Sequence, residues 1–443
     1  MKKYNIQSII DWLYRISTLK WFNYLQDALI AAFPIIVVNG FLETILQALM
    51  TDNGFFVVIF HLEHFVASDA VLINQLTVLV QLLKVFANTI IAVQFSRNVI
   101  KSLDNNIACG AMAAFSFIIL SIKLGQNHEL IFLIHGVTFA LLTGLGVSKC
   151  FDFFRVEVNK DDNDYQNALI ATLTNIKPIL CIIFCVLILK ILNFEIDSNG
   201  INAHLHSIIQ TALTDNHYSL IPMLLILFLR SISKFMGINA DFLFSFSTRA
   251  QLVNLNRALK FAHPVAAVHP TAYSTLYSCF AHLGGDGMLL ALIIVVLIIG
   301  KNQHLKRLLT WSFIPTFFNF SEPVMVGFPI MYMPIYLIPF IMSPLVTTVI
   351  AYPFLKYNIV PAPVYPVPNG TPGLLKAFIA TGGNIPTLLL ALLCLVVSCF
   401  IYLPFVKAEM RLINLEHAKI RSSFKVDCKI NPNAVRTKKI SFL

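Results

Sequence analysis

The sequence predicts an all-α polytopic membrane protein, and three observations carry this prediction. Of its 443 residues, 57% are hydrophobic and 12% are charged, whereas a soluble domain has roughly 25% charged residues. The apolar residues, among them 37 Phe, fall in long runs, so lipid must solvate much of the surface. Clusters of basic residues precede the first run and follow the last one, in a chain with a net charge of +10.

The apolar runs predict the positions of the membrane spans. A helix that crosses the bilayer needs about 20 mostly apolar residues. The segments that reach or approach this length are 28–50, 72–95, 107–124, 130–147, 178–194, 219–232, 287–300, 308–320, 334–352 and 385–406. Several of the later segments are short enough to be half-spans. Two polar stretches, 156–165 and 195–217, are predicted loops.

The distribution of charge predicts the orientation in the membrane. Positively charged residues near membrane segments mark the cytoplasmic side. We therefore expect both termini to be cytoplasmic and the number of spans to be even. The basic tail, residues 411–443, is interpreted as a topology signal that contacts anionic lipid, and we expect no nucleic-acid partner.

The second half of the chain is where the sequence predicts function. It holds most of the Pro and Gly, which break several of its apolar runs. Irregular backbone survives at membrane depth only where protein or a watery cavity satisfies its polar groups. Transporters place substrate at such broken helices. We therefore expect re-entrant hairpins and a substrate site within residues 234–385 of one transmembrane domain, residues 1–410.

Glu322 is the sharpest candidate for a functional residue. It is a single carboxylate in an otherwise apolar stretch, residues 317–344, next to Pro323 and five residues before Gly327. A carboxylate in the bilayer is costly and normally faces a cavity or a partner. Asn319 lies three residues earlier, so an amide and a carboxylate on a broken backbone could both accept hydrogen bonds from hydroxyls. The alternative is a structural Glu buried in an ion pair.

This stretch resembles the Asn-x-x-Glu-Pro-x-x-x-Gly-x-Pro signature of a family of sugar permeases. These are the enzyme IIC components of the phosphoenolpyruvate-dependent phosphotransferase system, in the lactose, cellobiose and diacetylchitobiose group. Further segments are similar to the family's Gly-Gly-x-Gly segment and the helix after it, its Pro to Thr-Gly-Gly segment, the end of its last helix and its first span. They are residues 281–308, 371–384, 401–407 and 25–42.

The resemblance implies a fold and a function. It implies a homodimer in the bacterial cytoplasmic membrane, with about ten spanning helices and two re-entrant hairpins per subunit. Residues 1–150 would form the dimerisation half, and the sugar site would lie near the midplane. In the family, the sugar is carried across and is phosphorylated by a separate enzyme IIB protein. This chain has no phosphoryl-accepting residue of its own, so its standing as an enzyme stays open.

Two residues of the candidate site depart from the family pattern. Relatives read Gly-Ile-His-Gly where this chain has Asn239 in place of the His, and they usually carry a Trp where this chain has Asn369. Asn hydrogen-bonds a hydroxyl but exchanges no proton near neutral pH. Glu322 is therefore the candidate base or hydroxyl ligand. Loss of the Trp removes an apolar platform on which a sugar ring can stack.

The candidate substrate-binding residues are Asn239, Gly284, Gly285, Asp286, Asn319, Glu322 and Asn369. The glycines could present backbone amides to a hydroxyl, or form a hairpin tip with no binding role. Glu43 and Lys84, which lie inside apolar spans, are interpreted as helix-packing or interface residues. We predict no cofactor, no metal site and no catalytic thiol.

Three functions stay open on the sequence alone. The first is a permease that binds a disaccharide or related glycoside and works with an enzyme IIB protein. The second is a degenerate IIC domain that serves as a membrane sensor or anchor without transport. The third is a proton- or ion-coupled transporter in which Glu322 carries the proton.

Overall fold

A computed structural model describes most of the chain: residues 20–62, 70–100, 106–124, 130–132, 135–154, 173, 175–198, 220–239, 248–261, 267, 269–300, 302–328 and 330–430. The predicted loop 156–165 and most of the predicted loop 195–217 lie outside these ranges. Of the basic tail, the structure describes the backbone of residues 411–430, which continues the last helix.

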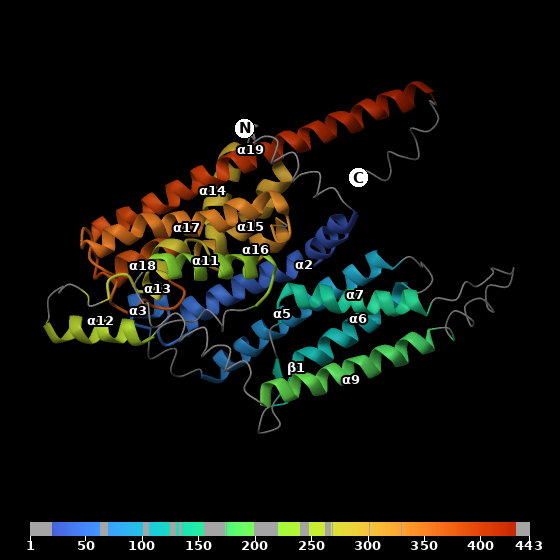
Figure 1. The fold of residues 1–443 in the computed structure, drawn as a ribbon, viewed down its shortest axis with the longest axis horizontal. Helices are drawn as coiled ribbons and strands as arrows, with labels where there is room; N and C mark the ends of the chain where they lie inside the picture. Colours follow the sequence, from blue (N-terminus) through green and yellow to red (C-terminus); the bar gives the residue numbers. More distant parts are fainter. Residues whose placement is uncertain are drawn as a thin grey trace.

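The amino-terminal part is a group of apolar helices packed side by side (Figure 1). Its helices are α2 (Lys20–Ile45) with a π-turn η1 (Leu46–Met50), α3 (Phe55–Phe60), α5 (Ala70–Val99), α6 (Asn106–Ser121), α7 (Val137–Phe153) and α9 (Ile176–Ser198). Helix α5 is central to this group, because α2, α6 and α7 all pack against it. Helix α9 covers α6 and α7 on the other side.

Small residues let these helices approach one another closely. A Cβ atom at Gly144 of α7 would lie 2.6 Å from the carbonyl oxygen of Ala92 on α5. Such contacts are typical of helices in lipid. Moving an apolar side chain from lipid into a helix interface gains little free energy, so the helices associate through close packing. A short antiparallel ribbon, β1 (Ile122–Leu124) and β2 (Leu130–Phe132), follows α6 and is an addition to the all-α prediction.

The carboxy-terminal part has one long helix, α19 (Ile385–Ile430), along its outer edge (Figure 1). Its elements are α11 (Leu220–Phe235), α12 (Thr248–Phe261), α13 (Tyr273–Leu276), a π-turn η3 (Tyr277–Ala281), a 3-10 turn η4 (Asp286–Met288), α14 (Leu289–Ile299), α15 (Gln303–Phe317), α16 (Glu322–Gly327), α17 (Pro334–Lys356), α18 (Gly373–Ala380) and α19 (Ile385–Ile430). Helix α19 packs against α14 and α17. Helix α2 joins the two parts, since it packs against α5 and also against α15 and α16.

Two segments of the carboxy-terminal part break their helices inside the protein. The first turns sharply before α14, where Gly284, Gly285 and Gly287 all have positive φ. At Gly287 a Cβ atom would lie 2.2 Å from the ring of Phe340, so this turn needs glycine for space as well as for conformation. The second segment places α16, a helix of six residues with Pro323 in its first turn, between two irregular stretches. These breaks are the backbone irregularities that the sequence predicts for residues 234–385.

The apolar helices agree with the predicted membrane class. Within the described residues, five helical stretches are long and apolar enough to cross a membrane: Lys20–Met50, Val71–Val99, Tyr273–Ile299, Pro334–Lys356 and Ile385–Met410. A helical protein with several candidate spans is thus confirmed. The count of about ten spans, the two re-entrant hairpins and the homodimer stay predictions.

Two of the predicted spans are wrong at one end. The span expected over 130–147 begins as the strand β2, and its helix starts only at Val137. The span expected over 107–124 leaves the helix at Ser121, where the Lys190 side chain donates to the carbonyl oxygen of Ile119 at 2.9 Å and to that of Ile122. Hydropathy alone does not show these ends, because a short apolar run is compatible with a strand as well as with a helix.

Candidate functional site

A cavity of about 800 Å³ opens between the two parts of the protein. One wall comes from α2, α5 and the segment 135–137 of the amino-terminal part. The other comes from α11 with the turn after it, the turn at 282–286, and the residues from 319 to 331. Four of the predicted site residues, Asn239, Asp286, Asn319 and Glu322, lie in this lining.

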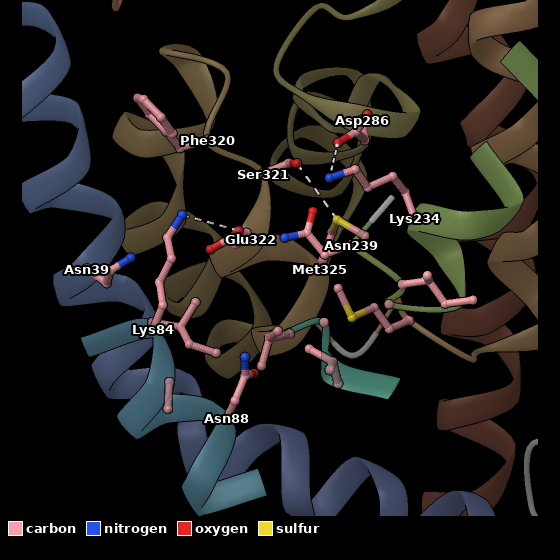
Figure 2. Close-up of a pocket in the computed structure, with 18 of the residues that line it drawn as sticks. Asn39, Lys84, Asn88, Lys234, Asn239, Asp286, Phe320, Ser321, Glu322 and Met325 are labelled. Carbon is pink, nitrogen blue, oxygen red and sulfur yellow. Dashed lines mark hydrogen bonds and ion pairs between the residues drawn. The ribbon is translucent and has the colours of Figure 1, made fainter. Parts of the chain in front are cut away.

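Glu322 is the carboxylate that opens most to the cavity. Its side chain is 53% exposed, although it stands at the first residue of α16 in the middle of the protein. One of its oxygens lies 3.6 Å from Nζ of Lys84, which reaches across from α5. Figure 2 shows these two side chains pointing toward each other. The Glu322 carboxylate therefore keeps an accessible oxygen and a charged neighbour at the same time.

Lys84 also binds a second carboxylate, that of Glu43 on α2. Both Glu43 oxygens lie 3.0 Å from Nζ of Lys84, and the two side chains are only 15–16% exposed. A buried ion pair is tolerated when close geometry offsets the cost of desolvation. Lys84 is thus held firmly by Glu43 and more loosely by Glu322. We name Glu43, Lys84 and Glu322 the ion-pair triad.

A second charged cluster surrounds Asp286, on the same wall as Glu322. Its carboxylate accepts a hydrogen bond of 2.7 Å from the hydroxyl of Tyr277, and it lies 3.5 Å from Nε of Arg230 and 3.7 Å from Nζ of Lys234. His282 adds a ring nitrogen at 3.8 Å. The Asp286 side chain is 13% exposed, so its hydrogen-bonding capacity is largely directed to this cluster.

Asn319 ties together the segments that build the cavity floor. Its backbone is left-handed, with φ of 71°. Its Oδ1 accepts from the backbone N–H of Gly284 at 3.1 Å, and its Nδ2 donates to the carbonyl oxygen of Thr371 at 3.1 Å. These two bonds engage both the oxygen and the nitrogen of the amide with the protein backbone. The geometry therefore gives Asn319 a positioning role beside the cavity.

Gly284 and Gly285 lie outside the cavity lining and pack against the scaffold. A Cβ atom at Gly285 would lie 2.4 Å from Cβ of Ser321, and one at Gly284 would lie 2.3 Å from Cβ of Leu290. The Gly284 N–H is already bonded to Asn319. Of the two roles that the sequence leaves open for these glycines, the packing role is the one that these contacts support, and substrate binding by them stays a prediction.

Asn239 lies on the turn that follows α11, next to the amino-terminal part. The neighbouring Gly136 is required for this contact, because a Cβ atom there would lie 2.1 Å from the carbonyl oxygen of Gly237. Tyr332 fastens the same turn, since its hydroxyl donates to the carbonyl oxygen of Met236 at 2.6 Å. Burial raises the pKa of Tyr332 to about 12, so the hydroxyl is protonated at neutral pH.

Asn369 is the third predicted site residue outside the cavity lining. It pairs through its backbone with the turn before α3: its N–H donates to Asn53 at 2.6 Å, and its carbonyl accepts from Phe55 at 2.8 Å. Its side chain is exposed. A direct role in the cavity described here has no support from this position.

Sequence reasoning missed the contribution of α2 and α5 to the site. Glu43 and Lys84, interpreted as packing or interface residues, line the cavity, and so do Asn39 and Asn88. On each helix the two residues are four apart, which places them on one face. The signal was available, because ionisable groups inside a membrane span are functional by default.

In sequence, three curated relatives each match about a third of the chain. No family model matches it. A "PTS system cellobiose-specific EIIC component" of Lactococcus lactis is 33% identical over 140 residues, which is 32% of this chain and 28% of the relative. A "Putative permease IIC component YwbA" and a "PTS system oligo-beta-mannoside-specific EIIC component" of Bacillus subtilis are each 28% identical, over 31% and 35% of this chain and the same shares of the relatives. The chain thus spans about a third of the length of these relatives.

A solved structure covers nearly the whole chain at lower similarity. It is titled "Crystal structure of the transporter ChbC, the IIC component from the N,N'-diacetylchitobiose-specific phosphotransferase system". It is 17% identical, covers 94% of this chain and 99% of its own, and has a TM-score of 0.43. The sequence matches, together with the apolar helices, indicate a multi-pass protein of the bacterial inner membrane. They confirm the resemblance that the sequence predicts: this chain is a relative of the enzyme IIC permeases of the lactose and cellobiose group of phosphotransferase systems.

Proposed function

We propose that the chain is the translocating component of a sugar phosphotransferase system, and that its cavity binds an uncharged disaccharide or related glycoside. The observation that carries this proposal is the half-exposed carboxylate of Glu322 at an 800 Å³ cavity between the two parts of an apolar protein. Small-molecule sites typically measure about 300–1,000 Å³. A glycoside fits this range.

The charges of the lining favour an uncharged substrate. Among the described lining residues there are three cations, Lys84, Arg230 and Lys234, and three carboxylates, Glu43, Asp286 and Glu322. Each carboxylate lies within 4 Å of at least one of these cations. A substrate rich in hydroxyls can donate to the open oxygen of Glu322 and accept from lysine and amide groups without disturbing this balance.

The relatives favour the same class of substrate. Their names specify cellobiose, lactose and oligo-beta-mannoside, and all of these sugars are glycosides. The family resemblance then implies that a separate enzyme IIB protein supplies the phosphoryl group. In this chain Glu322 would orient the accepting hydroxyl and take its proton, while Asn239 would hold it by hydrogen bonding alone.

The position of the cavity suits transport by movement of one part against the other. The ion-pair triad contains residues of both parts, because Glu43 and Lys84 belong to α2 and α5, whereas Glu322 belongs to α16. If the two parts separated first on one side of the triad and then on the other, the same site would be exposed to opposite faces of the membrane in turn. The matches to relatives give no support to the sensor or anchor alternative. Homodimerisation through residues 1–150 and the cytoplasmic placement of both termini are part of this proposal.

The test is equilibrium binding of a panel of disaccharides to the purified protein by calorimetry, with Glu322→Gln beside it. Hydrogen bonds to a charged group contribute about 1.5–3 kcal/mol, so the substitution is expected to weaken binding about 10- to 150-fold. Asp27→Asn, which removes an exposed carboxylate from α2 outside the cavity lining, is the matched control and should bind like the wild type. Absence of binding by every sugar, with folded protein, would refute the proposal.

A second measurement separates the phosphotransferase from the ion-coupled alternative. Membrane vesicles that contain the chain should form sugar phosphate only when an enzyme IIB protein and its phosphoryl donor are added. Sugar accumulation driven by a pH gradient without enzyme IIB would instead favour the proton-coupled transporter.

A further inference from the structure

Asn39 on α2 has unused hydrogen-bonding capacity at the cavity wall. Its side chain is 2% exposed, and its Oδ1 is buried without a hydrogen-bond partner. Asn39 also lines the cavity, and in Figure 2 the nitrogen end of its amide points to the side on which Lys84 and Glu322 lie. An unpaired buried polar atom costs about 1–3 kcal/mol, so a protein that keeps one usually has a use for it.

The neighbouring residues fix Asn39 in this place. Gly40 allows α2 to touch α16, since a Cβ atom at Gly40 would lie 2.8 Å from Cγ of Pro323. Asn39 is therefore held next to the backbone that carries Glu322. Glu43, one helical turn further along the same face of α2, uses both of its oxygens on Lys84.

Two other amides of the lining donate hydrogen bonds within the protein. Asn88 on α5 donates its amide to the carbonyl oxygen of His135 at 2.9 Å, and Asn319 uses both ends of its amide for the scaffold. Asn39 differs from Asn319 in that its amide oxygen has no partner, and from Asn88 in that this oxygen is buried. A sugar hydroxyl is both donor and acceptor, so it can pair with either end of an amide.

We propose that Asn39 is a specificity-determining residue, which hydrogen-bonds one hydroxyl of the sugar unit that lies between α2 and Glu322. This inference rests on the proposed function, because it assumes that the cavity binds a glycoside. It extends the site to α2. It also makes the recognition selective, because a site built to bond a hydroxyl rejects analogues that lack it.

The test is a scan of monodeoxy analogues of the best-binding disaccharide against wild type, Asn39→Leu and Asn39→Ala. The wild type should bind one deoxy analogue about 10-fold or more weakly than the parent sugar. Both variants should bind the parent about 10-fold more weakly and should no longer distinguish it from that analogue. Asn98→Leu, the same change at an α5 residue outside the lining, should keep the wild-type profile.

A second measurement distinguishes recognition from packing. Because Leu removes an unpaired buried oxygen, Asn39→Leu should unfold in the absence of sugar at the same temperature as wild type or higher. An unchanged deoxy profile in folded variants would overturn the proposal, and so would failure of both variants to fold, which would make Asn39 a packing residue. If wild type binds glycosides and Glu322→Gln binds them more weakly, such results would refute this inference alone. If wild type binds none, the proposed function itself fails.

Discussion

Replacement of Lys84 by Met is expected to destabilise the protein through Glu43 rather than through Glu322. Lys84 Nζ lies 3.0 Å from both oxygens of Glu43, whose side chain is 16% exposed, and 3.6 Å from Glu322, whose side chain is 53% exposed. Methionine has a similar length and no charge. The substitution therefore leaves one carboxylate buried without its cation and another that the cavity water can solvate.

The two carboxylates contribute very different amounts. Removal of one partner from a buried ion pair typically costs about 3–5 kcal/mol, which we assign to Glu43. The half-exposed pair with Glu322 is worth about 0–1 kcal/mol, because solvent screens it. With the unfolding entropy of soluble proteins, a chain of 443 residues would lose about 1 °C of melting temperature per kcal/mol, so we expect a fall of about 3–5 °C.

The assay is thermal unfolding of the purified protein in one detergent, for Lys84→Met, Glu43→Gln and the double variant. The double variant should recover most of the lost stability, because it no longer buries an unpaired charge. The double variant should still bind sugar more weakly than wild type, because it lacks Lys84, the charged neighbour of Glu322. The reasoning is refuted if Lys84→Met unfolds within 1 °C of wild type, or if the double variant is no more stable than the single one.

Two further predictions concern the scaffold around the cavity. Gly285→Ala should lower the melting temperature by several degrees, because its Cβ would lie 2.4 Å from Cβ of Ser321 at a φ of 89°, whereas Gly146→Ala, with no atom within 4 Å, should unfold like wild type. Tyr332→Phe should cost about 1 kcal/mol of stability, as calorimetric unfolding would show, because the hydroxyl that donates to Met236 is lost. Since the pKa of Tyr332 is raised to about 12, this contribution should be complete below pH 10 and should fade as the pH rises toward 12; a pH-independent difference would contradict the assignment.

The sequence predicts the broken carboxy-terminal part well because Pro and Gly are local signals. Pro323 starts α16, and Gly285 forms a turn that only glycine fits. The same signals predict that Asp286 and Glu322 lie near irregular backbone. They do not predict the partners of these carboxylates, because Arg230 and Lys84 come from helices that are distant in sequence.

The amino-terminal wall could not be predicted from local signals. Asn39 and Lys84 stand in long apolar runs, where hydropathy shows a span but not which face of the helix meets a cavity. The role of Asn319 was also hidden, because its bonds to Gly284 and Thr371 depend on how separate segments pack. Asn369 shows the opposite case: the family resemblance predicts a site residue, and the structure places its side chain at an exposed position beside α3.

The most direct test of the central claim is an experimental structure of the protein with its best-binding disaccharide. We predict sugar density inside the cavity, with a hydroxyl within about 3 Å of a Glu322 carboxylate oxygen. The same sugar should lie between the wall that carries Glu322 and Asp286 and the wall formed by α2 and α5. Sugar bound elsewhere, with the cavity empty and the Glu322–Lys84 pair unchanged, would contradict the account.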